Sequence, residues 1–133
     1  MRKLILFCIC YWIWAPLIAQ YRTPEIDSLT NVIKTTKSDS IRAHAHSRLS
    51  WLYASRNNKV AFAHNDSALS LFKTFKDLDG LAFTHYRRAL LHRLAGNYKK
   101  GLELIDLYSS HFELKKDTLR LANGLFQEGV IYS

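Results

Sequence analysis

Apolar residues recur at helical spacing over most of the chain. In the first such stripe, Ile26, Leu29 and Ile33 lie three and four positions apart, which places them on one face of a helix. A Thr-Pro pair precedes this stripe, and a threonine cap followed by proline in the first turn is typical of a helix start. No segment alternates apolar and polar residues with the two-residue period of a strand. The pattern predicts an all-α chain that begins with a short helix within residues 20–38.

Polar interruptions divide the remaining sequence into further helices. The interruptions fall near residues 57–58, 77–79, 96–97 and 115–117. We expect helices over residues 39–56 and 59–76, and three more that open at Asp79, Tyr98 and Asp117. With short polar turns between them, consecutive helices should pack as antiparallel hairpins.

The predicted hairpins repeat along the chain. Asp39, Asp79 and Asp117 each precede an aliphatic residue by two positions, and they follow one another at nearly equal intervals. We call the step from Asp39 to Asp79 the repeat interval. Two helices within an interval of this size are typical of a helical solenoid, in which each hairpin buries the apolar face of the next. The predicted units are about 39–78, 79–116 and an incomplete 117–133.

The residues of these units resemble the tetratricopeptide repeat (TPR) family. Residues 94–98, Leu-Ala-Gly-Asn-Tyr, are similar to the turn between the two helices of that repeat, and Gly101 falls at the small-residue position that follows. Ala61 and Ala68 fall at the two small-residue positions of the first unit. The sequence departs from the family where Arg88 replaces a leucine, and its repeat interval is longer than the usual length of about 34 residues.

The resemblance implies tandem antiparallel helix hairpins that form a short right-handed solenoid. It also implies a close helix contact at Gly101 and a concave groove, lined by the first helix of each hairpin, that binds a protein or peptide partner. The groove positions would be His44, Ser47, Trp51, Phe83, Tyr86, Leu90 and Arg93. The alternative is that Trp51 and Tyr86 pack between hairpins. Such units behind a signal peptide are similar to exported sensor segments of bacterial signalling proteins.

We expect residues 1–19 to be a secretory signal peptide. Arg2 and Lys3 give a positive start, a long apolar run follows, and Ala19 provides the small residue for cleavage before Gln20. The alternative is an uncleaved membrane anchor, although the apolar run is shorter than the roughly 20 residues of a spanning helix. The leader predicts an exported protein, periplasmic or at the cell surface.

Removal of the leader changes the composition that bears on function. Cys8 and Cys10 both lie in it, so the mature chain would have no cysteine for disulfides, thiol catalysis or metal binding. Loss of Arg2 and Lys3 leaves 17 of the 19 Lys and Arg against 11 Asp and Glu, a net charge of +6. The basic residues are scattered, as on solvated helix faces, and export argues against a nucleic-acid partner.

The sequence contains no pattern that predicts catalysis, a metal or a cofactor. His44 and His46 are two positions apart, which directs them to different helix faces, and His85 and His92 share a face without further ligands. The aspartates are better explained as helix caps than as acid–base pairs; this applies to Asp27, Asp39, Asp66, Asp77 and Asp79. The glycosylation sequon that begins at Asn65 falls within a predicted helix.

The predicted function is that of an exported scaffold for protein–protein interaction, as the sensory or docking part of a signalling protein. A small exported enzyme and a purely structural spacer are the alternatives. The third unit stops within its first helix, so we expect the chain to be a fragment, with repeats and an output domain downstream. Membrane attachment would require such a downstream segment or a retained leader. The sequence leaves the partner's identity and the oligomeric state open.

Overall fold

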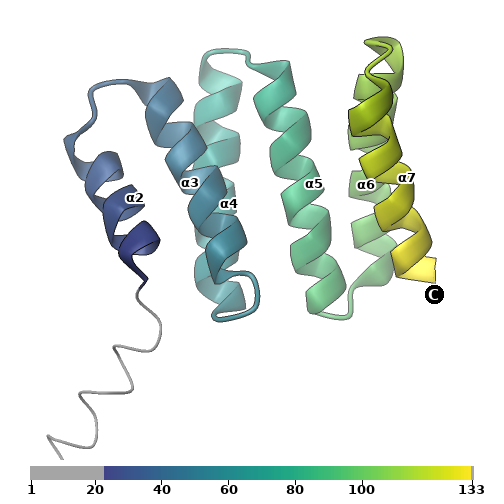
Figure 1. Ribbon diagram of the computed structural model, residues 1–133, viewed down its shortest axis with the longest axis horizontal. Coiled ribbons are helices and arrows are strands. Elements are labelled where there is room, and N and C mark those ends of the chain that lie inside the picture. Colours follow the sequence, from purple (N-terminus) through teal and green to yellow (C-terminus); the bar gives the residue numbers. More distant parts are fainter. Residues whose placement is uncertain (1–22, 133) are drawn as a thin grey trace, which may run out of the picture.

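A computed structural model describes residues 23–132 as six α-helices, without a strand in this range (Figure 1). The helices are α2 (Pro24–Thr35), α3 (Asp39–Tyr53), α4 (Asn58–Thr74), α5 (Leu78–Leu94), α6 (Tyr98–Leu114) and α7 (Thr118–Tyr132). The all-helical prediction is confirmed for this range. The predicted signal peptide lies outside the described residues.

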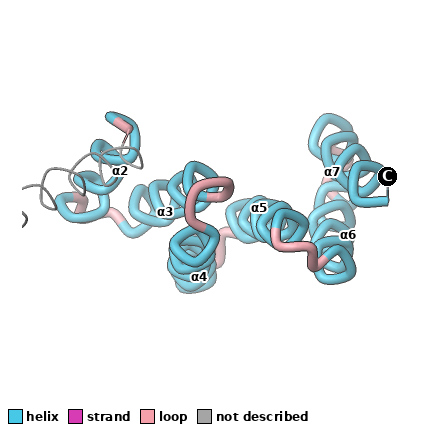
Figure 2. The backbone as a smooth tube through the Cα atoms, turned by 90° about the horizontal axis from the view of Figure 1, so that it is seen from below, coloured by secondary structure: helices cyan, strands magenta, loops and turns pink. Residues whose placement is uncertain are grey.

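From α3 onward, each helix packs against the helix that precedes it, which produces an elongated row of hairpins (Figure 1). The helices α3 and α4 form one antiparallel hairpin, α5 and α6 form the next, and α7 packs on α6. Viewed along the helices, α3, α5 and α7 lie toward one side of the row, while α4 and α6 lie toward the other (Figure 2). The first helices of successive hairpins therefore share a face, as the repeat pattern predicts.

Side-chain caps fix several helix starts. The Ile26 amide donates to Thr23 Oγ1 at 3.3 Å, and the Gly80 amide donates to Asp77 Oδ1 at 2.9 Å. The helix α5 therefore begins at Leu78, and the prediction that Asp79 opens it is wrong. Both aspartates suit a cap by residue type. Asp77 takes this role because it is the residue that follows the turn.

From α4 onward, the helices begin at a constant spacing along the chain. The helices α4 to α7 start at residues 58, 78, 98 and 118, and short links of equal length join them. Each link contains one residue with positive φ: Lys76 (58°), Gly96 (77°) or Lys116 (56°). In each link the next amide donates to the carbonyl five positions back, as Asp77 does to Phe72 at 3.0 Å. This is the Schellman arrangement, which ends a helix and satisfies its last carbonyls.

The predicted helices 39–56 and 59–76 end earlier than expected, at Tyr53 and Thr74. The last turn of each belongs to the link, because the positive φ of Lys76 and the cap formed by Asn57 already redirect the chain. The predicted turn positions are otherwise confirmed to within a few residues.

The core consists of small clusters between neighbouring helices. One combines Ala43 of α3 with Ala68 and Phe72 of α4, and another combines Ala82 of α5 with residues of α6. The predicted close contact at Gly101 is confirmed. A Cβ there would lie 3.2 Å from the Ala89 carbonyl oxygen on α5, so the missing side chain lets the two backbones approach.

Polar side chains also contribute to these interfaces. Asn65 is fully buried, and its Nδ2 donates to the Thr84 carbonyl at 3.1 Å. Arg88 Nη1 donates to Asn65 Oδ1 at 3.2 Å and also pairs with Asp66. The sequon at Asn65 is therefore incompatible with glycosylation of the folded chain. The prediction that Asp66 caps a helix is wrong, because it lies within α4 and holds Arg88.

The last helix, α7, carries apolar side chains on its exposed surface. Leu119, Leu125 and Phe126 are 76%, 56% and 67% exposed. These side chains are left uncovered by α6, the helix against which α7 packs. Within residues 23–132, no helix combines the length and apolar composition that crossing a bilayer requires.

Candidate binding pocket

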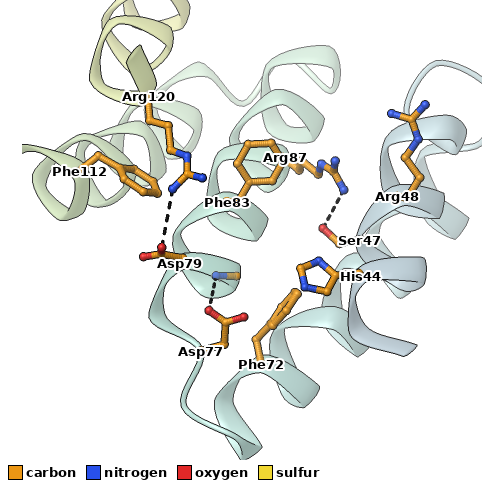
Figure 3. A pocket seen from close by; sticks show the side chains of 11 residues that line it. His44, Ser47, Arg48, Phe72, Asp77, Asp79, Phe83, Arg87, Phe112 and Arg120 are labelled. Atoms are coloured by element: carbon orange, nitrogen blue, oxygen red, sulfur yellow. Dashed lines mark hydrogen bonds and ion pairs between the residues drawn. The ribbon is translucent and has the colours of Figure 1, made fainter. Parts of the chain in front are cut away.

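A pocket of about 330 Å³ opens on the face that α3, α5 and α7 share (Figure 3). We call it the α3–α5–α7 pocket. Its lining combines aromatic, basic and acidic side chains: His44, Ser47, Arg48, Phe72, Asp77, Asp79, Gly80, Phe83, Arg87, Phe112 and Arg120. A concave site built from three successive units is the kind of surface that repeat proteins use for binding.

Three phenylalanines supply the apolar part of the pocket. Phe72 and Phe112 are buried at the same position of successive hairpins, one repeat interval apart, whereas Phe83 is 38% exposed. Gly80 makes room for Phe72, since a Cβ at position 80 would overlap that ring. The pocket therefore offers aromatic surface beside its charged groups.

The two acidic side chains of the pocket are already engaged. Asp77 caps α5, and Asp79 accepts hydrogen bonds from His111 Nε2 at 2.7 Å and Lys115 Nζ at 2.6 Å. Arg120 Nη1 also lies 3.7 Å from Asp79 Oδ2. The hydrogen bonds from Lys115 and His111 hold the pKa of Asp79 below its usual value. Asp79 thus ties α5 to α6 and α7 rather than capping a helix.

The three arginines of the pocket differ in their partners. Arg48 Nε donates to Glu25 Oε1 of α2 at 2.8 Å. Arg120 pairs with acidic side chains on α5 and before α7, and its guanidinium lies 4.9 Å from the centre of the Phe112 ring. Arg87 has no ion-pair partner among residues 23–132.

Arg87 is held by a hydroxyl and a ring instead. Its Nη1 donates to Ser47 Oγ at 2.8 Å, and its guanidinium lies 4.8 Å from the centre of the Phe83 ring (Figure 3). Burial and the nearby charge of Arg48 lower the pKa of Arg87 to about 10. The side chain therefore stays protonated at neutral pH, and it carries a positive charge that no carboxylate of this region balances.

Three of the predicted groove residues line this pocket, namely His44, Ser47 and Phe83. Trp51 is 44% exposed on α3, outside the pocket lining. Tyr86 packs within the α5–α6 hairpin rather than between hairpins, with its ring 4.9 Å from that of Tyr108.

The other two predicted groove residues of α5 contribute less. Leu90 is only 3% exposed, so almost none of its side chain is left for a partner. Arg93 is half-buried, and its Nε is buried without a hydrogen bond. The physical reason is the central place of α5, which contacts α3, α4 and α6.

Sequence reasoning missed most of the charged pocket residues, above all Arg48, Arg87 and Arg120. One signal was available: Arg87 follows Ser47 by one repeat interval, and Arg120 follows Gly80 by the same interval. Equivalent positions of successive units face the same side of the array. Counting one repeat interval from the predicted groove position Ser47 would therefore have placed Arg87 on the pocket face, whereas Arg120 is reached only from Gly80, which the sequence did not mark as a groove position.

His44 and His46 lie on different faces of α3, as their two-residue spacing predicts. His44 lies at the pocket, with its ring edge-on to Phe72 at 5.0 Å, while His46 Nδ1 lies 2.9 Å from His64 Nδ1 on α4. In the described part of the chain, no group of three or more His, Cys, Asp or Glu could hold a metal ion.

Comparison of the chain with protein-family models, curated proteins and solved structures finds no match. The fold and the pocket define an all-helical array of hairpins with one basic, aromatic pocket on the face of its first helices. Membership of the TPR family stays a prediction.

Proposed function

We propose that this chain is a helical-repeat scaffold that binds a protein or peptide partner in the α3–α5–α7 pocket. The observation that carries the proposal is the pocket itself, because two successive hairpins and α7 place exposed aromatic and basic groups on one concave surface. Phe83 and the nearby exposed Trp51 are suitable anchors, since large aromatic side chains dominate many protein interfaces. On this proposal the array is a short right-handed, TPR-like solenoid.

The alternatives have less support. An enzyme would need an acid, base or nucleophile placed to react in the pocket. Asp77 and Asp79 are engaged as a cap and in ion pairs, and the exposed imidazole of His44 faces the Phe72 ring edge-on rather than a nucleophile. Ser47 is buried, and its hydroxyl accepts a hydrogen bond from Arg87 rather than contacting a base. A structural spacer has no need for exposed aromatic side chains beside a pocket.

Photo-crosslinking in the native host tests the binding role. Photoreactive benzoylphenylalanine in place of Phe83 or Trp51 should yield an adduct with one discrete protein. The same group at Leu107, which is 58% exposed on α6, should not yield that adduct. Equal adducts at all three positions, or none at the pocket, would contradict the proposal.

We also propose that the scaffold works outside the cytoplasm, as the sensory or docking part of a signalling protein. The apolar leader with its basic start supports export. Mass spectrometry of the protein from the host should find an N-terminus at Gln20. An intact Met1 in the membrane fraction would instead indicate a retained anchor.

A further inference from the structure

The charges inside the α3–α5–α7 pocket are not balanced. Arg48 and Arg120 each pair with a carboxylate, whereas Arg87 has only the Ser47 hydroxyl and the Phe83 ring. A guanidinium offers five N–H donors in a planar fork, and the Ser47 contact uses one of them. A partly buried charge without an opposite charge is costly to a fold. Arg87 is therefore the group whose partner is missing from this part of the chain.

The pocket's own acids do not supply that partner. Asp77 is directed to the Gly80 amide at the start of α5. Asp79 is held by Arg120 of α7 (Figure 3). It is also held by His111 of α6 and by Lys115 of the link between α6 and α7. Recruiting Asp79 for Arg87 would break three ion pairs that join α5 to this end of the array. Arg87 therefore remains without an opposite charge in the folded chain from residue 23 to residue 132.

We propose that Arg87 binds a carboxylate of the partner, from an Asp or Glu side chain or a chain terminus that lies next to an aromatic or aliphatic residue. The inference rests on the proposed partner-binding function. The planar fork of a guanidinium matches the two oxygens of a carboxylate, which it can bind through two parallel hydrogen bonds. Phe72, Phe83 and Phe112 provide the aromatic surface that the apolar neighbour of this carboxylate would contact.

A carboxylate suits this pocket better than a phosphate group. One unpaired guanidinium balances the single charge of a carboxylate, whereas a phosphate monoester carries nearly two charges at pH 7. Arg48 and Arg120 could supply the second charge only by leaving Glu25 and Asp79. The aromatic lining also favours an organic acid over a strongly hydrated inorganic anion.

A pair of small probes tests the charge requirement directly. 3-Phenylpropionate carries an aromatic ring and a carboxylate, and 3-phenylpropanamide has nearly the same shape without the charge. Both are titrated by ¹⁵N NMR into protein purified after expression of the full chain, and the Nε–Hε signal of Arg87 is followed. The acid should bind at least about tenfold more tightly than the amide, since hydrogen bonds between charged groups are the stronger ones. Equal affinities would overturn the inference.

Two substitutions with the same change in charge locate the effect. Arg87→Gln should abolish the preference for the acid, whereas Arg56→Gln, at an exposed site in the α3–α4 link, should retain it. If Arg87→Gln fails to fold by circular dichroism, Arg87→Lys replaces it and should reduce the preference, because lysine lacks the fork. A preference unchanged in the folded Arg87 variant would overturn the assignment.

Inorganic phosphate is the third probe. If it shifts the Arg87 signal at lower concentration than 3-phenylpropionate, the pocket is a phosphate site and the carboxylate assignment is wrong. The crosslinking experiment separates the two proposals. A partner adduct at Phe83 without preference for the acid rejects only the carboxylate. Acid binding without any partner adduct rejects the scaffold function.

Discussion

Equivalent positions in successive units differ in the size of their side chains. One repeat interval separates Ala68 of α4 from Tyr108 of α6, and the same interval separates Thr84 of α5 from Gly124 of α7. A Cβ at Gly124 would lie 3.1 Å from Tyr108 Cδ1 and would overlap Ser109 Oγ. Burial raises the pKa of Tyr108 to about 12, with a neighbouring tyrosine on α5 adding to the shift. The glycine thus provides the room that the larger tyrosine occupies.

Gly124→Ala should therefore destabilise the fold, by about 1–3 kcal/mol, as expected for overpacking. Gly129→Ala is the matched control in the same helix, because nothing lies within 4 Å of a Cβ at that position. The control should stabilise by up to about 1 kcal/mol, since alanine has the higher helix propensity. Denaturant melts of both variants measure the difference. The same sign of change for both would show that Gly124 is not a close contact.

The histidine pair between α3 and α4 predicts a loss of stability in acid. Burial, the charge of His64 and that of Arg42 lower the pKa of His46 to about 4, and burial lowers the pKa of His64. The folded state then binds fewer protons than the unfolded state, whose histidine pKa is about 6.5. Stability should be full above about pH 6.5 and should fall as the pH drops toward about 4.

Urea melts at several pH values between 7 and 4 measure this slope. His46→Gln should flatten it, because the substitution removes one imidazole of the pair. His44→Gln removes an exposed imidazole at the pocket and should leave the slope close to that of the wild type. If the two variants show the same pH dependence, the pair is not its source.

At the scale of elements, the links that follow α4, α5 and α6 share one backbone geometry. Lys76, Gly96 and Lys116 occupy the same left-handed position, but only Gly96 is the residue type that adopts it without steric cost. Nothing lies within 4 Å of a Cβ at Gly96, so a side chain there would meet only backbone strain. The two lysines carry that strain in the natural sequence.

Lys116→Gly should therefore stabilise the chain by about 0.5–1 kcal/mol, because glycine removes the left-handed strain. Lys73→Gly, in the last turn of α4, is the control and should cost about 1 kcal/mol, the helix propensity of glycine. Thermal melts of both variants provide the comparison. A destabilised Lys116→Gly would mean that the lysine makes a contact that outweighs its strain.

The helices were predictable from sequence because each apolar stripe and each cap is a local signal. The exact start of α5 was less predictable, since Asp77 and Asp79 both have cap chemistry. The role of Asp79 is decided by His111 and Lys115, which lie beyond the following turn at the far end of the next helix. For the pocket, only the face of the array on which it lies was predictable. Its charge balance depends on which acids the other helices engage, and a single sequence does not display those long-range pairs.

At the scale of the whole molecule, contacts connect mainly neighbouring helices, so the last helix described has a neighbour on one side. The apolar residues of α7 are consequently left at the surface, with Leu125 and Phe126 more than half exposed. Exposed large apolar side chains promote association or aggregation where they gather on a surface.

Replacing Phe126 with Lys should raise the temperature at which the chain aggregates, while the free energy of unfolding changes by less than about 0.5 kcal/mol, as is usual for exposed sites. Leu114→Lys, at an 87% exposed site at the end of α6, is the control and should change aggregation less. Light scattering during heating and denaturant melts separate the two quantities. If Phe126→Lys leaves the aggregation temperature unchanged, a surface that does not include Phe126 drives the aggregation.

The regular links between helices also bear on how such a gene can change in length. Residues 58–97 contain one complete pair, α4 and α5, and the helix that begins at each boundary follows an asparagine: α4 follows Asn57, and α6 follows Asn97. Duplicating or removing that stretch in frame joins Asn97 to Asn58 or Asn57 to Tyr98, so every junction remains a helix start after an asparagine. Recombination in steps of one helix pair therefore requires no newly invented loop. Each added step would bring another Arg87, so the number of unbalanced guanidinium groups would grow with the length of the array.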